Sequence, residues 1–151
     1  HEWRRAVSLL GHMRGQGGVK PDIVSFGAAI SACEKGGQWA WAVFCWSEMD
    51  RQGLQPDLVA RNSLISACAR GRQASLALRL LEEAEGAKTR REQPDVITYN
   101  AAVTACARAQ RWAQVAALVA RMRARGLCPD VVTYNTALSA CEGGAAWPSG
   151  L

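Results

Sequence analysis

Asparagine and aspartate recur in this sequence at regular intervals, and their side chains could form hydrogen bonds with a ligand. The asparagines are Asn62, Asn100 and Asn135, and the aspartates that follow a proline are Asp22, Asp57, Asp95 and Asp130. A carboxamide offers both donors and acceptors, and a carboxylate is an acceptor that can hold a neighbouring amide or a bridging water in place. The alternative is structural, because an asparagine in the first turn of a helix can also cap backbone groups.

Residues arranged for catalysis are not found in the sequence. It contains no Ser/His/Asp set, no phosphate-binding loop and no H-x-E motif with the C-x-x-C of a deaminase. The acidic run Glu82, Glu83 and Glu85 could bind a metal, but a solvated outer helix face is the better interpretation. We therefore expect no enzymatic activity, no metal or cofactor and no small-molecule substrate.

Four of the six cysteines also recur, one in each copy of a longer pattern. They are Cys33, Cys68, Cys106 and Cys141. A disulfide ladder is disfavoured, because packed helices lie about 8–10 Å apart and bridged Cα atoms must lie within about 7 Å. A zinc site is disfavoured by the lack of any C-x-x-C pair. We predict that these cysteines are small buried apolar residues.

The longer pattern is an internal repeat. The aspartates of the four Pro-Asp pairs are spaced by 35, 38 and 35 residues. A similar sequence follows each pair, such as Val-Ile-Thr-Tyr-Asn-Ala-Ala-Val-Thr-Ala-Cys after Asp95 and Val-Val-Thr-Tyr-Asn-Thr-Ala-Leu-Ser-Ala-Cys after Asp130. Fixed spacing of this length is typical of a stack in which each unit buries its apolar face against its neighbours.

Each unit is predicted to fold as two helices. The first begins just after Pro-Asp, where an acidic residue suits the helix dipole and can accept hydrogen bonds from free N–H groups. The second covers segments such as 39–52 and 112–125 and ends at Gly53 or Gly126, because glycine readily takes a left-handed conformation. The fold class is therefore all-α, a right-handed α-solenoid of helix-turn-helix repeats.

The spacing divides the chain into one incomplete unit at each end and three complete ones. We assign the second helix of a preceding repeat to residues 1–22, followed by repeat 1 (23–57), repeat 2 with a three-residue insertion (58–95), repeat 3 (96–130) and a partial repeat 4 (131–151). Because the chain starts at His1 and stops within the pattern, we interpret it as a fragment of a longer protein.

Composition excludes two classes of protein and is compatible with a polyanionic partner. Hydrophobic residues make up 49% of the 151 residues and charged residues 21%, which is typical of neither a disordered chain nor a membrane protein. The formal net charge of +5 is carried mostly by arginine. Such a charge favours polyanion binding only weakly by itself.

The period and the text after Pro-Asp resemble those of the pentatricopeptide repeat family. The segment Pro129-Asp-Val-Val-Thr-Tyr-Asn-Thr-Ala-Leu is similar to the usual repeat sequence of that family. Tetratricopeptide repeats, with 34 residues and other signature positions, fit less well. The resemblance implies a concave surface, lined by the first helices, that holds single-stranded RNA at about one base per repeat.

The resemblance also assigns roles to individual residues. In the family the fifth and the last residue of a repeat together recognise one base, and an Asn/Asp pair favours uracil. The fifth positions here are Gly27, Asn62, Asn100 and Asn135, and the last positions are Asp57, Asp95 and Asp130. Gly27 has no side chain for recognition, so repeat 1 should be nearly indifferent. The insertion in repeat 2 would disturb its preference if it moved Asp95 away from Asn62.

Three further sets of residues follow from the repeat. By resemblance, the aliphatic residues that sandwich bases are Val24, Val59, Ile97 and Val132, and the basic residues that contact phosphate are Lys35, Arg70 and Arg108, with Gly143 at that place in repeat 4. Trp3, Trp39, Trp112 and Trp147 recur at the start of the second helices. They could stack on bases, but we predict that they pack the second helix into the core.

The resulting hypothesis is a sequence-biased single-stranded-RNA-binding module without membrane association. By resemblance it acts in organellar RNA processing, stability or translation, in mitochondria or chloroplasts, alone or by recruiting protein factors. Two alternatives stay open at this point. One is a protein-interaction scaffold of the tetratricopeptide kind, and the other is the targeting arm of a larger RNA-processing enzyme.

Overall fold

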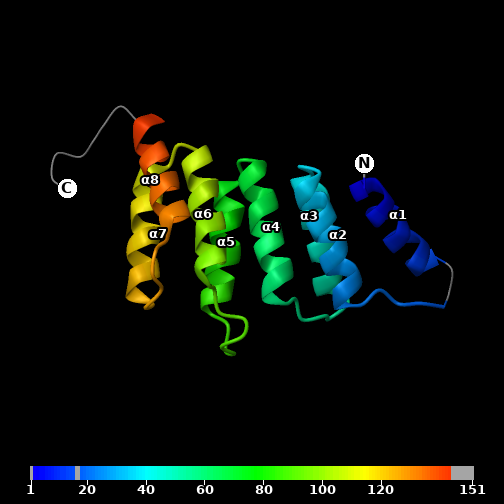
Figure 1. Cartoon of the computed structure of the whole chain (residues 1–151). Helices are drawn as coiled ribbons and strands as arrows, with labels where there is room; N and C mark the ends of the chain where they lie inside the picture. Colours follow the sequence, from blue (N-terminus) through cyan, green and yellow to red (C-terminus); the bar gives the residue numbers. More distant parts are fainter. Residues whose placement is uncertain (1, 16–17, 144–151) are drawn as a thin grey trace.

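Eight α-helices, arranged side by side in chain order, build the part of the chain that the structure describes (Figure 1). This computed structural model describes residues 2–15 and 18–143, so Trp147 lies outside the described residues. The helices are α1 (Glu2–Gly15), α2 (Ile23–Lys35), α3 (Trp39–Arg51), α4 (Leu58–Arg70), α5 (Ala74–Glu85), α6 (Val96–Arg108), α7 (Trp112–Ala124) and α8 (Val131–Gly143). None of these helices is long and apolar enough to cross a membrane.

The Pro-Asp pairs start the first helix of each unit, as predicted. Each aspartate accepts a hydrogen bond from the backbone N–H three residues later, at N···O distances of 2.8, 2.8, 2.9 and 3.0 Å for Asp22, Asp57, Asp95 and Asp130. This is N-terminal capping, which satisfies an N–H group that has no partner within the helix. At the other end, Gly53 and Gly126 follow the second helices with φ angles of 72° and 77°. The predicted left-handed ends are confirmed.

The helices form two layers that are packed differently. The first helices α2, α4, α6 and α8 contact one another directly, and α3, α5 and α7 each pack between two successive first helices. Among the described helices, the backbones of α1, α3, α5 and α7 do not contact one another. The first helices therefore lie closer together than the second helices do. Hairpins α2–α3, α4–α5 and α6–α7 fall within the ranges assigned to repeats 1, 2 and 3.

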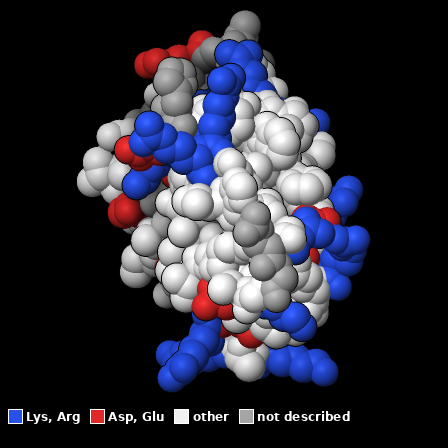
Figure 2. Space-filling view, turned by 90° about the vertical axis from the view of Figure 1, so that its right-hand side faces the viewer, with Lys and Arg blue, Asp and Glu red and all other residues white. Residues whose placement is uncertain are grey.

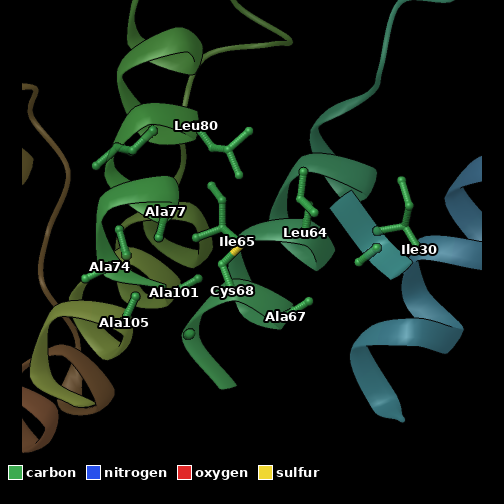
Figure 3. Close-up of a cluster of buried hydrophobic side chains, with 14 of the residues drawn as sticks. Ile30, Leu64, Ile65, Ala67, Cys68, Ala74, Ala77, Leu80, Ala101 and Ala105 are labelled. Carbon is green, nitrogen blue, oxygen red and sulfur yellow. The ribbon is translucent and has the colours of Figure 1, made fainter. Parts of the chain in front are cut away.

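The apolar core runs continuously between the layers (Figure 3). Ile65 and Cys68 of α4 face Ala77 and Leu80 of α5 in this view, and all four are buried. Stacking therefore buries apolar surface that an isolated hairpin would expose to water.

The cysteine prediction is confirmed for three of its four residues. Cys33, Cys68 and Cys106 are fully buried, whereas Cys141 in α8 is half-buried. All four are free thiols. Burial raises the pKa of the Cys68 thiol to about 12, because the thiolate would lose its solvation. These thiols are therefore packing residues.

The tryptophan prediction holds for the first two residues of the set. Trp3 and Trp39 are partly buried and pack against the core cluster, each beside a glycine of the next repeat. Trp112 is 38% exposed. Trp3 and Trp39 each pack against the glycine directly after the next first helix, and the corresponding residue after α8 lies outside the described residues.

Candidate nucleic-acid interface

Two asparagine–aspartate pairs form between successive first helices, because each aspartate caps the first helix that follows its asparagine. The Asn100 Nδ2 atom lies 3.1 Å from Oδ1 and 3.3 Å from Oδ2 of Asp130. The Asn62 Nδ2 atom lies 3.4 Å from Oδ1 of Asp95. Both pairs join a fifth position to the last position of the same assigned repeat. The insertion in repeat 2 therefore leaves Asp95 beside Asn62.

A threonine that sequence reasoning missed completes each pair. The Thr98 hydroxyl donates to Asn62 Oδ1 at 2.7 Å, and the Thr133 hydroxyl donates to Asn100 Oδ1. Both threonine side chains are fully buried, and they are the buried polar residues of the described chain. The sequence motif that could have revealed these threonines is Asp-x-x-Thr, which occurs where the preceding repeat has asparagine at its fifth position.

The carboxylate of Asp130 is negatively charged. Hydrogen bonds from the Thr133 backbone N–H and hydroxyl, with a further one from Asn100, hold the pKa of Asp130 below its usual value. The N-terminus of α8 adds a positive partial charge at the same place. Asp130 is therefore ionised at neutral pH and only accepts hydrogen bonds.

Repeat 1 lacks this cluster. Gly27 stands where the asparagines stand in the later repeats, and Asp57 only caps the N–H of Ala60. A Cβ atom at Gly27 would lie 4.0 Å from the Ala60 Cβ, which is ordinary van der Waals contact. The place is open but carries no group for hydrogen bonding to a base.

A row of exposed aliphatic side chains accompanies the asparagines. Its members are Val24, Val59, Ile97 and Val132, whose exposed fractions are 77%, 72%, 63% and 56%. Each is the second residue of its first helix. Regular exposure of large apolar side chains at one repeat position indicates a contact surface, because isolated apolar residues on a surface would show no such period.

The three basic residues assigned to phosphate differ in their surroundings. Arg70 forms an ion pair with Glu34 at 3.4 Å and donates to the Lys35 carbonyl at 3.5 Å. Lys35 and Arg108 are exposed, and neither forms an ion pair with a described residue. Arg108 lines a groove between α6 and α8 together with Asn135. Arg108 is thus the best placed of the three for an anion.

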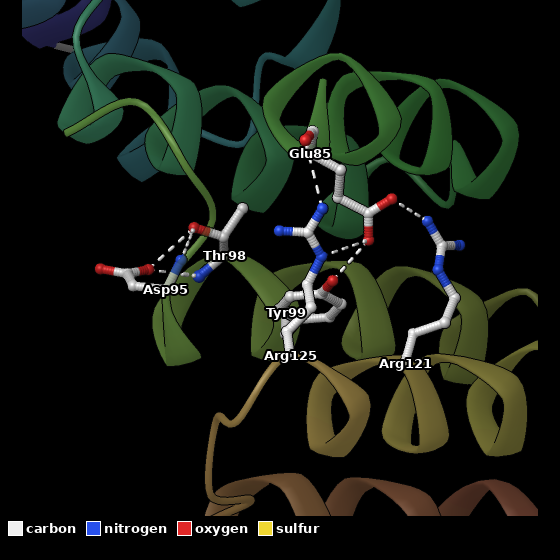
Figure 4. Close-up of polar contacts among 6 residues, drawn as sticks. All are labelled: Glu85, Asp95, Thr98, Tyr99, Arg121 and Arg125. Carbon is white, nitrogen blue, oxygen red and sulfur yellow. Dashed lines mark hydrogen bonds and ion pairs between the residues drawn. The ribbon is translucent and has the colours of Figure 1, made fainter. Parts of the chain in front are cut away.

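The prediction of a solvated acidic face is wrong for Glu85. The Tyr99 hydroxyl and the Arg121 guanidinium both hydrogen-bond to its carboxylate, and Arg125 Nε lies 3.7 Å away (Figure 4). Arg121 of α7 and Arg125, which directly follows this helix, therefore connect α7 to α5. Glu82 and Glu83 are exposed, as expected.

Charge is also distributed around the α1 end of the stack. Figure 2 shows this end with lysine and arginine side chains at the border of a broad uncharged surface. The arginines of α1 include Arg4, whose guanidinium carbon lies 5.3 Å from the Trp3 ring centroid. Positive charge therefore surrounds this end rather than forming one compact patch on it.

Three family models match successive parts of the chain. They are described as PPR repeat (residues 24–54), Pentatricopeptide repeat domain (residues 45–91) and PPR repeat family (residues 94–142). No curated protein matched the chain. Together the models cover residues 24–91 and 94–142.

Solved structures show the same architecture. The chain is similar to the pentatricopeptide repeat protein PPR10 in complex with an 18-nt psaJ RNA element, with 26% identity over 88% of this chain and a TM-score of 0.75. It is also similar to PPR10 from maize, with 33% identity over 95% of this chain and a TM-score of 0.71. The chain spans about a fifth of the length of PPR10. The predicted right-handed α-solenoid is thereby confirmed, and the chain belongs to the pentatricopeptide repeat family.

Proposed function

We propose that this chain binds single-stranded RNA along its first-helix layer, at about one base per repeat. The observation that carries the proposal is the alternation of exposed aliphatic residues with Asn–Asp pairs on successive first helices. Similarity to PPR10, which was crystallised with an 18-nt RNA element, supports the same ligand class. Unpaired bases can be splayed apart and held between protein side chains, whereas paired bases cannot.

Each complete cluster would hold one base. Val59 and Ile97, from successive repeats, would contact the two faces of a base, and Asn62 would meet its edge. Uracil suits such a carboxamide, because uracil presents a carbonyl acceptor beside an N–H donor. We accordingly propose a preference for uracil at the Asn62–Asp95 and Asn100–Asp130 pairs and indifference at Gly27.

Phosphate contacts would supply affinity without selectivity. Arg108 and Lys35 are exposed for this role, while Arg70 is engaged with Glu34. With few repeats, we expect binding at about micromolar Kd or weaker at physiological salt. Within a longer protein, the module would direct RNA processing, stability or translation in a mitochondrion or chloroplast.

The test is a fluorescence-anisotropy titration of the chain with labelled oligomers of U, A, C and G at low and at physiological salt. The expected result is tighter binding of U-containing strands. Asn100→Ala should relax the uracil preference at one position while leaving the thermal unfolding midpoint nearly unchanged. Equal binding of all four strands that disappears with salt would leave only a basic surface. No binding by a well-folded chain would favour a protein-interaction scaffold.

A further inference from the structure

We propose that Thr98 and Thr133 are positioning residues that fix the orientation of the base-contacting carboxamides of Asn62 and Asn100. Each threonine belongs to the repeat that follows its asparagine. The inference rests on the proposed function, and it adds a third residue to the two that recognise each base. It predicts that selectivity for uracil depends on a buried hydroxyl that touches no base.

The carboxylate determines which end of the amide it meets. An ionised carboxylate only accepts hydrogen bonds, so the NH2 group of Asn100 turns towards Asp130 and its oxygen turns away. That oxygen then meets the Thr133 hydroxyl. The same arrangement recurs at Asn62, Asp95 and Thr98. Each amide is therefore held at both of its polar atoms.

The hydroxyl has one proton and two acceptors within reach. Thr98 Oγ1 lies 2.8 Å from Asp95 Oδ1 and 2.7 Å from Asn62 Oδ1, and it accepts the Asp95 backbone N–H at 3.1 Å. Figure 4 shows Thr98 and Asp95 facing each other at the start of α6. The single proton is therefore shared between the Asp95 carboxylate and the Asn62 amide oxygen, so the hydroxyl supports the amide orientation that the aspartate sets.

A fixed amide discriminates between pyrimidines. The amide keeps one free N–H and one free oxygen lone pair, in an order set by its aspartate and threonine. Uracil presents a carbonyl beside N3–H, whereas cytosine presents an amino group beside the N3 lone pair, so the two edges need opposite amide orientations. A carboxamide that rotated freely by 180° could satisfy either base. One oriented by the aspartate and held by the threonine satisfies uracil.

The repeats of this chain vary together at these positions. Threonine is the third residue of the repeats that follow Asn62 and Asn100, and Ala60 takes that position after Gly27. The hydroxyl is thus absent where no amide needs orientation. At the same position of repeat 1, the Ser25 hydroxyl donates a hydrogen bond to Asp22 at 2.9 Å. Ser25 therefore contributes to the helix cap without contacting an asparagine, so a Ser25 variant tests the capping role alone.

Thr133→Val tests the loss of the hydroxyl at nearly constant shape. We expect the ratio of U to C affinity at one position of an oligomer to fall about fivefold, the effect of about one net hydrogen bond. Thr133→Ser should restore the ratio, and Ser25→Ala should leave it unchanged. A purely structural role would weaken U and C binding equally, and that outcome would overturn the inference.

A gain of selectivity tests the same idea without removing a helix cap. Gly27→Asn with Ala60→Thr would build a third cluster beside Asp57, and the space at Gly27 admits a side chain. We expect the double variant to prefer uracil at one additional position and Gly27→Asn alone to show little selectivity. Equal selectivity of the two variants would refute the positioning role. Absence of uracil preference in the unmodified chain would instead refute the proposed function itself.

Discussion

The indole of Trp39 lies against Gly71 across a repeat boundary and leaves no room for a side chain there. A Cβ atom at Gly71 would stand 2.5 Å from Cγ and 2.8 Å from Nε1 of the ring. Trp3 meets Gly36 in the same way, with its Cγ at 3.0 Å. Where the second helix begins with Ala74 instead, the corresponding residue of the next repeat is Ala109.

Gly71→Ala should therefore destabilise the chain by about 1–3 kcal/mol, the usual cost of forcing an extra carbon into a packed site. The φ angle of Gly71 is −84°, so the backbone tolerates alanine and the effect is steric. Urea unfolding followed by circular dichroism measures it. Adding Trp39→Ala recreates the Ala74–Ala109 combination, so it should remove the steric penalty of the alanine at residue 71. If Gly71→Ala costs as much in the Trp39→Ala background as alone, the steric explanation is wrong.

Tyr99 should make stability fall at alkaline pH. Burial, followed by the hydrogen bond to Glu85, raises its pKa to about 12, above the value of about 10 in an unfolded chain. The folded state therefore keeps the proton more tightly than the unfolded state. The contribution of Tyr99 is fully present below pH 10 and is lost as pH rises towards 12.

Tyr99→Phe checks this assignment. At pH 9 the variant should be less stable by about 1–2 kcal/mol, because the hydrogen bond to Glu85 is lost. By pH 11 the difference between the two proteins should shrink by about 1 kcal/mol. Tyr134→Phe, at the equivalent but exposed position in α8, is the control. A difference that stays constant from pH 9 to 11 would argue against ionisation of Tyr99 as the cause.

Arg61 should be replaceable with a gain in stability. It occupies the fourth position of repeat 2, where the other repeats have Phe26, Tyr99 and Tyr134. Its Nε and Nη1 atoms are buried without a hydrogen-bond partner among the described residues, and its guanidinium carbon lies 5.7 Å from the Trp46 ring centroid. Unsatisfied buried donors cost more than one cation–π contact supplies.

Arg61→Tyr should consequently raise the free energy of unfolding by about 1 kcal/mol. The measurement is the urea midpoint in parallel with Arg79→Tyr, an exposed site on α5 where no change is expected. A lower midpoint for Arg61→Tyr would mean that the contact with Trp46 outweighs the unpaired donors.

Arg108 should contribute to affinity equally for all RNA sequences. Arg108→Ala should reduce the slope of log K against log salt by about 0.7, the value for one phosphate contact with a single strand. Titrations at several salt concentrations measure the slope. Arg70→Ala should change it less, because Glu34 already neutralises that side chain. A loss confined to one base sequence would contradict the phosphate role of Arg108.

The sequence predicted the helices well because their boundaries depend on local chemistry. Asp95 caps the residues directly after it, and Gly53 ends the helix directly before it, so neither needs knowledge of distant residues. The pairing of Asn100 with Asp130 came from the family resemblance, and the structure places the two atoms within hydrogen-bonding distance.

Contacts that depend on neighbouring repeats were harder to predict. From the sequence, Thr133 would be assigned only to the cap of its own helix. Its contact with Asn100 could not be predicted locally, because the two residues are 33 positions apart in the chain. Glu85 was assigned to solvent because its helix is an outer one, yet Tyr99 and Arg121 of the next repeat both hydrogen-bond to it. Such contacts require the distance and rotation between units, which periodicity alone does not supply.

The two layers of the stack are connected differently. The first helices contact one another directly, whereas the second helices are bridged by long side chains, as where Arg14 reaches Glu48 at 2.7 Å and Arg121 reaches Glu85. Long charged side chains can extend or rotate by several bonds before any apolar surface is exposed. The spacing of the first helices is thus fixed by direct packing, whereas the spacing of the second helices is less constrained, because side chains with several rotatable bonds connect them.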